Sequence, residues 1–310
     1  MKRFALTGAA GYVAPRHMKA IKETGNQLIA ALDPFESVGI IDSYFPEAEF
    51  FTEPELFEAH LEEQRARGQG IDLLSITSPN YLHSPQIRMA LRLGADALSE
   101  KPLVLTTAEL DRLAELEEET GRRIYTVLQL RVHPALIALR QRLRNERGVK
   151  DVILTYVTGR GKWYLKSWKG DVAKSGGLAT NIGVHFFDLL YWFFGPAERI
   201  EVHARNDTVV AGFLALERAR VRWFLSIDAS FVPDELRKKG QRTYRSITVD
   251  GEEVEFSGGF TDLHTEVYRK TLGGEGFGLE DTREAIRITE AIRDLSLSPG
   301  GAKHPFMVKP

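Results

Sequence analysis

The chain has 310 residues, of which 43% are hydrophobic and 27% charged, and its formal net charge is −2. This composition is typical of a globular protein with two domains, and the near-neutral charge argues against nucleic acid as a partner. Because the sequence has no cysteine, disulfides, zinc–thiolate sites and thiol catalysis are excluded. No apolar run reaches the roughly 18 residues of a spanning helix, and the first residues do not resemble a signal peptide. We therefore expect a cytoplasmic protein that does not span a membrane.

The first third of the chain alternates strand and helix patterns. Short apolar runs predict strands at residues 3–7, 27–33, 71–77, 96–100 and 123–129, and the segments between them predict helices at 12–24, 53–68, 84–94 and 106–121. The last of these helices has a threonine cap at Thr106 and a glycine stop at Gly121. Apolar strands that alternate with helices predict a parallel sheet covered by helices, which is a Rossmann domain. We place this domain at residues 1–129.

The pattern changes after about residue 130, where longer runs of alternating or β-branched residues begin. They predict strands at 151–161, 199–205, 208–216, 219–230 and 245–256, the last with an Asp-Gly turn near its middle, and helices at 134–145, 183–195 and 280–295. Strands that follow one another without helices indicate a mostly antiparallel sheet. The predicted fold class is thus an α/β Rossmann domain followed by an α+β domain with a large, mostly antiparallel open sheet at residues 130–310.

A glycine turn, "LTGAAGYVA" at residues 6–14, follows the first predicted strand and opens the first helix. Gly8 and Gly11 would let backbone N–H groups approach the pyrophosphate of a dinucleotide. Asp33 ends the second strand, 22 residues after Gly11. An acid at this position hydrogen-bonds an adenosine ribose and repels a 2′-phosphate, which favours NAD over NADP. A plain tight turn and an ordinary surface acid are the alternatives.

Three further stretches carry a family resemblance: "ITSPNYLH" (76–83), "SEKPL" (99–103) and "GGLATNIGVHFFDLLYWFFG" (176–195). With the glycine turn, they resemble the glucose–fructose oxidoreductase/inositol dehydrogenase (Gfo/Idh/MocA) family over essentially the whole chain. The resemblance implies an NAD-dependent oxidoreductase that forms dimers or tetramers. Independently of it, Ser78, Glu100 and Gln129 follow parallel strands, where a doubly wound sheet binds its ligand.

The resemblance also implies roles for individual residues. Lys101 would touch both nicotinamide and substrate, and His185 would be the general base. Asn181 stands where many family members have aspartate, and we expect it to share a helix face with His185, four residues later. The predicted catalytic set is Lys101, His185 and Asn181. The predicted cofactor-binding set is Gly8, Gly11, Tyr12, Val13, Asp33, Ser78, Asn80, His83, Glu100, Lys101 and Gln129.

The substrate is suggested by "ATNIGVHFFDLLYWFFG" together with "SWKGD" at residues 167–171. These stretches are similar to those of a branch of the family that oxidises the 3-hydroxyl of UDP-N-acetyl-glucosaminuronic acid. That oxidation is a step in the synthesis of a diacetamido-mannuronic acid of bacterial surface polysaccharide. Some members of that branch reoxidise bound NADH with 2-oxoglutarate, and others exchange it. Residues 158–171 interleave cations with aromatic rings, which suits an anionic sugar nucleotide, although a solvated basic loop is the alternative. The predicted substrate-binding set is Arg131, Arg160, Lys162, Trp163, Tyr164, Asn181 and His185.

Two other functions compete with this one. A dehydrogenase of the same family could act on a polyol or on a different sugar, and an NAD-binding sensor would need no catalysis. A metal enzyme is not predicted, because no cluster of histidine and carboxylate has metal-ligand spacing in the sequence. We interpret His17, His60, His203 and His304 as isolated residues.

Overall fold

The structure, a computed structural model, describes residues 1–254 and 262–308. The chain separates into two compact units. The first contains Met1–His133 and a later segment that ends at Arg283, and the second begins at Pro134 and includes the chain from Glu284 onward. The units thus divide a few residues after the predicted boundary at 129–130. The return of the later segment to the first unit was not predicted.

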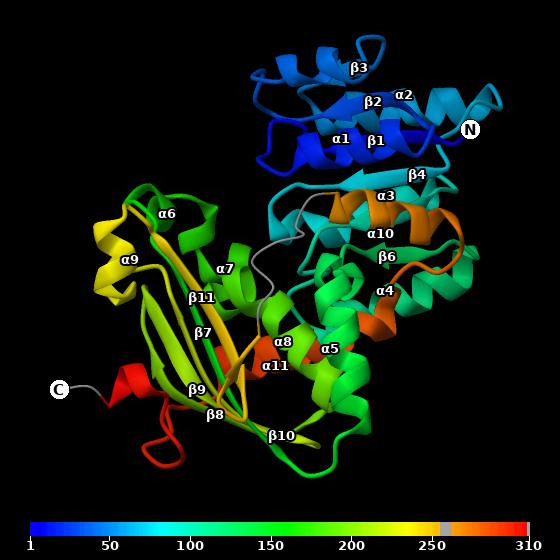
Figure 1. Ribbon diagram of the computed structural model, residues 1–310. Helices are drawn as coiled ribbons and strands as arrows, with labels where there is room; N and C mark the ends of the chain where they lie inside the picture. The colour runs from blue at the N-terminus through cyan, green and yellow to red at the C-terminus, as the bar shows by residue number, and fades with distance from the viewer. Residues whose placement is uncertain (255–261, 309–310) are drawn as a thin grey trace. The chain divides into compact units, whose positions relative to one another are not determined.

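The first unit is built on a six-stranded sheet of order β3-β2-β1-β4-β5-β6 (Figure 1). Its strands are β1 (Arg3–Thr7), β2 (Gln27–Leu32), β3 (Glu49–Phe51), β4 (Leu73–Ile76), β5 (Asp96–Ser99) and β6 (Ile124–Thr126). All neighbouring pairs are parallel. This confirms the predicted Rossmann sheet and adds β3, which is too short to give a sequence signal. The order reverses between β1 and β4, the place where such sheets bind ligands.

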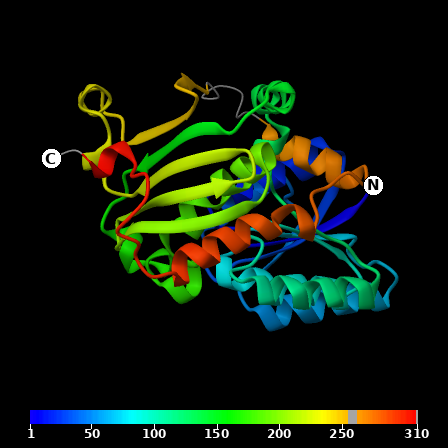
Figure 2. The ribbon, with the colours of Figure 1, turned by 90° about the horizontal axis from the view of Figure 1, so that it is seen from below.

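Helices flank this sheet (Figure 2). They are α1 (Ala14–Glu23), α2 (Pro54–Ala66), α3 (His83–Arg92), α4 (Thr107–Thr120) and α10 (Leu263–Leu272), with 3₁₀ turns at Gly39–Ser43, Asn80–Leu82 and Gln129–Val132. The caps predicted for α4 are confirmed: the Thr106 hydroxyl accepts the Glu109 N–H at 3.2 Å, and Gly121 adopts φ +65°. The two cap residues therefore set the ends of this helix.

Helix α10 is the element of the first unit that the sequence analysis missed. Its side chains Leu263, Val267 and Tyr268 are buried in one apolar cluster with Phe4 of β1 and Met18 of α1. The rings of Phe4 and Tyr268 stack with centroids 5.8 Å apart. These contacts join residues more than two hundred positions apart in the chain, so no local pattern reveals them.

The second unit contains a six-stranded sheet of order β12-β11-β7-β10-β9-β8. Its strands are β7 (Lys150–Thr158), β8 (Ala197–Arg205), β9 (Val209–Leu216), β10 (Ala219–Ser226), β11 (Thr243–Val249) and β12 (Glu252–Glu253). Only the β7–β10 pair is parallel among those described, so the predicted mostly antiparallel sheet is confirmed. The predicted Asp-Gly turn joins β11 to β12, with φ +51° at Asp250 and +85° at Gly251. The predicted strand end at 255–256 lies outside the described residues.

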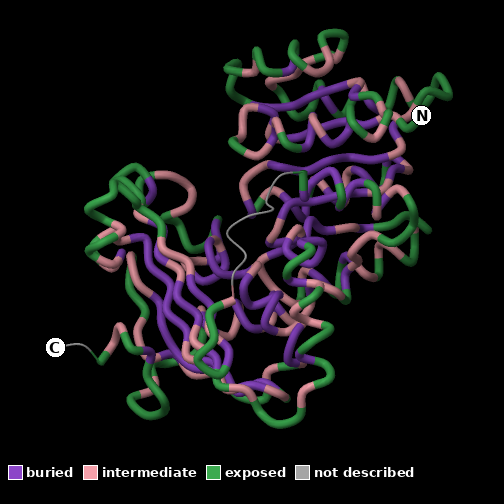
Figure 3. The backbone as a smooth tube through the Cα atoms, viewed as in Figure 1, coloured by how far each residue is buried: buried purple, intermediate pink, exposed green. Residues whose placement is uncertain are grey.

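Apart from α10, the helices described from residue 134 onward are α5 (Pro134–Asn145), α6 (Trp163–Lys166), α7 (Val172–Ser175), α8 (Val184–Phe194), α9 (Asp234–Lys238) and α11 (Leu279–Asp294). There are 3₁₀ turns at Trp168–Gly170, Ala229–Phe231 and Pro305–Met307, and a π-helical turn, Ala179–Gly183, leads into α8. Helix α8 is buried along much of its length (Figure 3) and packs Phe187 edge-on against Trp223 of β10, at 5.5 Å between ring centroids. It ends at Gly195, as predicted.

Candidate active site

The glycine turn lies at the carboxyl ends of β1 and β4. Gly8 adopts φ +79°, and a Cβ there would lie 2.5 Å from the Ser78 backbone nitrogen. A Cβ on Gly11 would lie 2.9 Å from the Gly8 carbonyl oxygen. Both positions therefore require glycine, because the turn and the β4 end approach each other at backbone distance. The N–H groups of Tyr12 and Val13 have no hydrogen-bond partner among the described residues. Two free N–H groups where α1 begins suit a phosphate.

Asp33 connects the glycine turn to the end of β2. Its carboxylate accepts the Ala10 N–H and the Phe35 N–H, each at 2.9 Å, and the residue is 6% exposed. The Phe35 ring is 72% exposed. Sequence reasoning missed Phe35, an exposed aromatic two residues after the acid that is predicted to bind the ribose.

The end of β4 holds three of the predicted cofactor residues. The Ser78 hydroxyl donates to Gln86 Oε1 at 2.7 Å, and Asn80 is buried. His83 is 1% exposed, and its ring nitrogens face two backbone carbonyls, Pro102 O at 2.7 Å and Ser78 O at 2.9 Å. Burial lowers the pKa of His83. The ring therefore lies between the β4 end and the segment after β5, and as a neutral imidazole it can donate to one of the two carbonyls.

Lys101 lies two residues after the end of β5 and precedes a cis peptide bond to Pro102. It is half-buried. Burial lowers the pKa of Lys101, and the negative charge of Glu100 opposes that shift only in part. A lysine of lowered pKa at the ligand edge of the sheet can donate a hydrogen bond, and it gives up its proton at a lower pH than an exposed lysine does.

Glu100, predicted to stand near the cofactor ribose, is 7% exposed. Its carboxylate lies with His17 and His264 in a group whose ligand-type atoms are all within 4.8 Å of one another. The expectation that His17 is isolated, and that the chain has no carboxylate–histidine cluster, is thus wrong. The members come from α1, the end of β5 and α10, so sequence spacing could not have shown the cluster.

Gln129 and Arg131 follow β6. The Gln129 Oε1 atom is buried and has no hydrogen-bond partner within the described ranges. Such an orphaned acceptor indicates a missing ligand donor. Arg131, predicted to bind substrate, is 6% exposed and donates to Asp281 through Nη1, at 2.9 Å to Oδ1, and through Nη2, at 2.7 Å to the carbonyl. Its guanidinium is therefore committed to an ion pair within the first unit.

The second unit brings together Asn181 and Tyr164, whose hydroxyl accepts a hydrogen bond from the Asn181 amide. Asn181 lies in the π-helical turn, and His185 lies in the first turn of α8. The predicted sharing of one α-helical face thus needs correction, since the turn between them is wider than an α-helical turn. Gly183 packs closely there, because a Cβ on it would lie 2.4 Å from the Leu225 side chain. The His185 ring is half-buried, 4.2 Å from the ring of Phe186 and 6.1 Å from that of Tyr156.

Four cationic side chains of the basic segment, residues 158–171, are not paired with carboxylates. Within residues 1–254 and 262–308 no ion pair involves Arg160, Lys162, Lys166 or Lys169. Lys169 Nζ lies over the ring of Trp168 at 4.3 Å, and burial together with the charge of Arg160 lowers its pKa. Trp163 is 54% exposed, so it is not a core residue.

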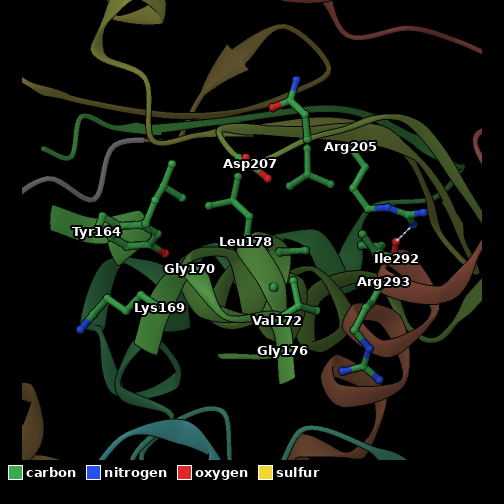
Figure 4. Close-up of a pocket in the computed structure, with 15 residues that line it drawn as sticks. Tyr164, Lys169, Gly170, Val172, Gly176, Leu178, Arg205, Asp207, Ile292 and Arg293 are labelled. Atoms are coloured by element: carbon green, nitrogen blue, oxygen red, sulfur yellow. Dashed lines mark hydrogen bonds between the residues drawn. The ribbon is translucent and has the colours of Figure 1, made fainter. Parts of the chain in front are cut away.

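Figure 4 shows a cavity of about 290 Å³ next to this segment, lined by Tyr164, Lys169 and Arg205 among others. Arg205 donates through Nη1 to the Ile292 and Leu295 carbonyls at 2.8 Å, and these neutral acceptors leave its positive charge in place. Tyr164 is 2% exposed, and its hydroxyl is held by Asn181. Arg205 and the exposed cations of the basic segment are thus available to an anion.

No helix within the described part of the chain is both long enough and apolar enough to cross a membrane.

Comparisons with known proteins agree with this geometry. Residues 2–128 match the family model GFO_IDH_MocA, an oxidoreductase family with an NAD-binding Rossmann fold, and residues 149–221 match the C-terminal alpha/beta domain of that oxidoreductase family. Among curated proteins, the putative UDP-kanosamine synthase oxidoreductase subunit of Amycolatopsis mediterranei is 30% identical over 66% of this chain, and the match spans 57% of that relative's length.

Two solved structures cover nearly the whole chain. Both are of the WlbA (WbpB) dehydrogenase from Thermus thermophilus, which is 71% identical over 99% of this chain and 100% of its own. One is a complex with NAD and alpha-ketoglutarate, with a TM-score of 0.97, and the other a complex with NAD and UDP-GlcNAcA, with a TM-score of 0.96.

Proposed function

The chain belongs to the Gfo/Idh/MocA oxidoreductase family, and from this premise we propose that it oxidises the sugar 3-hydroxyl of UDP-N-acetyl-glucosaminuronic acid to a ketone with NAD⁺. The observation that carries the substrate is the 71% identity to a dehydrogenase that binds UDP-GlcNAcA. Such a product would serve the synthesis of a diacetamido-mannuronic acid of bacterial surface polysaccharide. A homo-oligomer and a cytoplasmic location stay predictions.

The residues of the first unit fit NAD. The glycine turn leaves two N–H groups free for the pyrophosphate, Asp33 has acceptor capacity for a ribose diol, and Gln129 Oε1 lacks a donor within the described chain. When bound, the nicotinamide would accept the hydride from sugar C3. Phe35 would pack on the adenine.

The basic segment supports an acidic, diphosphate-bearing substrate. Its unpaired cations can bind a sugar carboxylate and a diphosphate, and the exposed face of Trp163 can stack on a ring. A neutral polyol would leave these cations without a function. We therefore propose Arg160, Lys162, Trp163 and Lys169 as substrate contacts.

The reaction would divide between two side chains. His185 would accept the proton of the 3-hydroxyl while the hydride leaves C3, and Lys101 would donate a hydrogen bond to the oxygen as its negative charge develops. Asn181 cannot accept a proton at neutral pH, so we assign it to orientation through Tyr164. In the second half-reaction, we propose 2-oxoglutarate as the oxidant that restores NAD⁺, because the same relative also binds alpha-ketoglutarate.

The test is a single-turnover assay on the full chain. NADH absorbance should appear with UDP-N-acetyl-glucosaminuronic acid and stay absent with UDP-N-acetylglucosamine and inositol. Adding 2-oxoglutarate should then remove the signal if the cofactor is recycled in place, whereas a persistent signal would show that NADH is exchanged. Turnover of inositol or of another polyol would replace the proposed substrate, and tight NAD binding without turnover of any sugar would indicate a sensor.

Asp33 gives a prediction on cofactor choice. Replacing it with serine removes a charged acceptor for the ribose, so we expect NAD affinity to fall by about 10- to 100-fold. NADP affinity should rise or stay constant, since the repulsion of its 2′-phosphate is lost. Fluorescence titrations with each cofactor measure both values, and Glu36→Gln, which removes an exposed charge nearby, is the control. Equal losses for NAD and NADP would show that Asp33 only holds the glycine turn.

A further inference from the structure

The buried group of Glu100, His17 and His264, called here the Glu100 cluster, has no part in the proposed chemistry. The Nε2 atoms of His17 and His264 lie 3.1 and 3.0 Å from Glu100 Oε1. The backbone N–H of Lys101 donates to the other oxygen, Oε2, at 3.2 Å. All three residues are buried: His17 is 0% exposed, Glu100 7% and His264 8%. The carboxylate is thus enclosed by protein donors.

If the two imidazoles are neutral, the hydrogen bonds around the Glu100 cluster allow only one placement of the ring hydrogens. An ionised carboxylate only accepts, so each imidazole must carry its hydrogen on Nε2. His17 Nδ1 is then an acceptor, and the hydroxyl of Tyr268, 2.8 Å away, donates to it. The Tyr268 oxygen in turn accepts from the Ser75 hydroxyl at 2.6 Å. The chain of bonds runs from β4 through α10 and α1 to Glu100, and no member of it lacks a partner.

The charges of the cluster agree with this assignment. Burial alone would raise the pKa of Glu100, but the hydrogen bonds from His17 and His264 outweigh it and hold that pKa well below its ordinary value. Burial lowers the pKa of His17. An ionised carboxylate therefore faces a neutral His17 imidazole, and that carboxylate fixes the tautomer of the ring.

We propose that Glu100 is a positioning residue, a carboxylate that His17 and His264 hold in place and that in turn fixes the backbone at Lys101. This inference rests on the proposed function, because it assumes that the Lys101 side chain must be aimed at the reacting oxygen. It also explains a role of α10, because this helix supplies His264, which donates to Glu100, and Tyr268, which contacts His17. Glu100 accordingly acts through Lys101 and is not itself a ligand of the cofactor ribose.

A metal ion is the competing interpretation, since two imidazoles and a carboxylate form a common ligand set. The separations of 3.0–3.1 Å between nitrogen and oxygen fit direct hydrogen bonds without an ion between the groups. Each nitrogen of His17 also has a protein partner already. Metal analysis of the purified protein is nevertheless part of the test.

The kinetic test compares NAD affinity with turnover in the full-length protein. For Glu100→Gln we expect kcat to fall by about 10²-fold, the cost of misplacing a reacting group by an ångström or so, while the NAD dissociation constant changes less than about threefold. His264→Leu should likewise lower kcat while leaving the NAD dissociation constant nearly unchanged. His264→Gln, whose amide nitrogen can replace Nε2 as the donor, should recover kcat to within about tenfold of the parent. Glu266→Gln, on the exposed side of α10, is the matched control.

Several results would overturn the proposal. A parallel loss of NAD affinity and turnover in Glu100→Gln would make Glu100 a cofactor ligand after all. Parental kcat in a folded His264→Leu protein would show that α10 has no influence on Lys101. A stoichiometric metal ion that His264→Leu abolishes would make the cluster a metal site.

Nitrogen NMR of labelled histidines tests the cluster without any substrate. At neutral pH the His17 signals should report a neutral ring with hydrogen on Nε2, and Tyr268→Phe should keep that tautomer, because the Glu100 carboxylate still requires a donor. A protonated His17, or a ring with hydrogen on Nδ1 in either protein, would contradict the assignment. Because this readout needs only NAD-loaded protein, it distinguishes failure of the cluster from failure of the proposed substrate.

Discussion

Replacing Lys101 with alanine is expected to lower kcat by about 10²- to 10⁴-fold, the range typical of losing a group that stabilises charge or transfers a proton. The reason is that oxidation of an alcohol places negative charge on its oxygen, and Lys101 follows β5 at the ligand edge of the parallel sheet. The measurement is single-turnover formation of NADH, with NAD affinity determined separately. Affinity should stay within a few fold of the parent, because the glycine turn and Asp33 are untouched.

Two companion variants make the Lys101 prediction specific. Lys270→Ala removes a surface lysine of the same unit, paired with Glu275, and should leave kcat unchanged. Lys101→Arg keeps the charge but replaces a compact ammonium with a planar fork, so it should recover only part of the activity. Wild-type turnover in Lys101→Ala would remove Lys101 from the mechanism.

The pH dependence of turnover follows from the lowered pKa of Lys101. A hydrogen-bond donor to the alkoxide must be protonated, so activity should fall as pH rises through that pKa. Because burial lowers it from the ordinary lysine value, the fall should begin at a lower pH than for an exposed lysine. In Lys101→Arg the same limb should disappear, since arginine stays protonated throughout. An alkaline limb that persists unchanged in Lys101→Arg would belong to another group.

Local signals were sufficient to predict most of the fold. The glycine turn, the caps of α4 and the Asp-Gly turn between β11 and β12 each depend on residues close in sequence, and each was found where expected. The strands of the Rossmann sheet were visible because both of their faces are buried and their apolar runs are nearly continuous. The extra strand β3 has only three residues, which is too few to show a period.

Long-range contacts account for what the sequence did not reveal. Helix α10 belongs with β1 and α1, yet nothing near residue 263 indicates its partners. For the same reason His17 was interpreted as isolated, although its ring contacts Tyr268 and Glu100. Ser78, Glu100 and Gln129 follow strands of the parallel sheet as expected, whereas the protein contacts of His83, Glu100 and Arg131 could not be predicted from sequence spacing.

The widened turn before α8 shows the same limit at shorter range. The predicted helix began at residue 183, and the i, i+4 rule aligned Asn181 with His185 as if that helix extended back to Asn181. In the π-helical turn, Gly183 lies against Phe187 and against Leu225 of β10, so part of its surroundings comes from a strand distant in the sequence. The periodicity of apolar residues does not reveal the extra residue of a π-helical turn. Such turns occur often at functional sites.

His185→Gly is expected to lower kcat by about 10²- to 10⁴-fold through loss of the proton acceptor. The ring is half-buried at the start of α8, beside Phe186 and Tyr156, so glycine leaves a space of imidazole size. Added imidazole should enter that space and restore activity in proportion to its unprotonated concentration. The measurement is NADH formation against imidazole concentration at several pH values, with His60→Asn as a control on a histidine of the first unit.

Chemical rescue decides between two accounts of His185. If the residue only supported the packing of α8, imidazole would raise thermal stability without restoring turnover. If it accepts the proton, rescue should follow the basicity of the added amine, because proton transfer obeys a Brønsted relation. Rescue by imidazole but not by a protonated amine of similar size would assign the proton to this ring, and leave Lys101 the hydrogen bond to the alkoxide. Absence of rescue with intact NAD binding would exchange the two roles, since Lys101 with its lowered pKa is then the remaining acceptor.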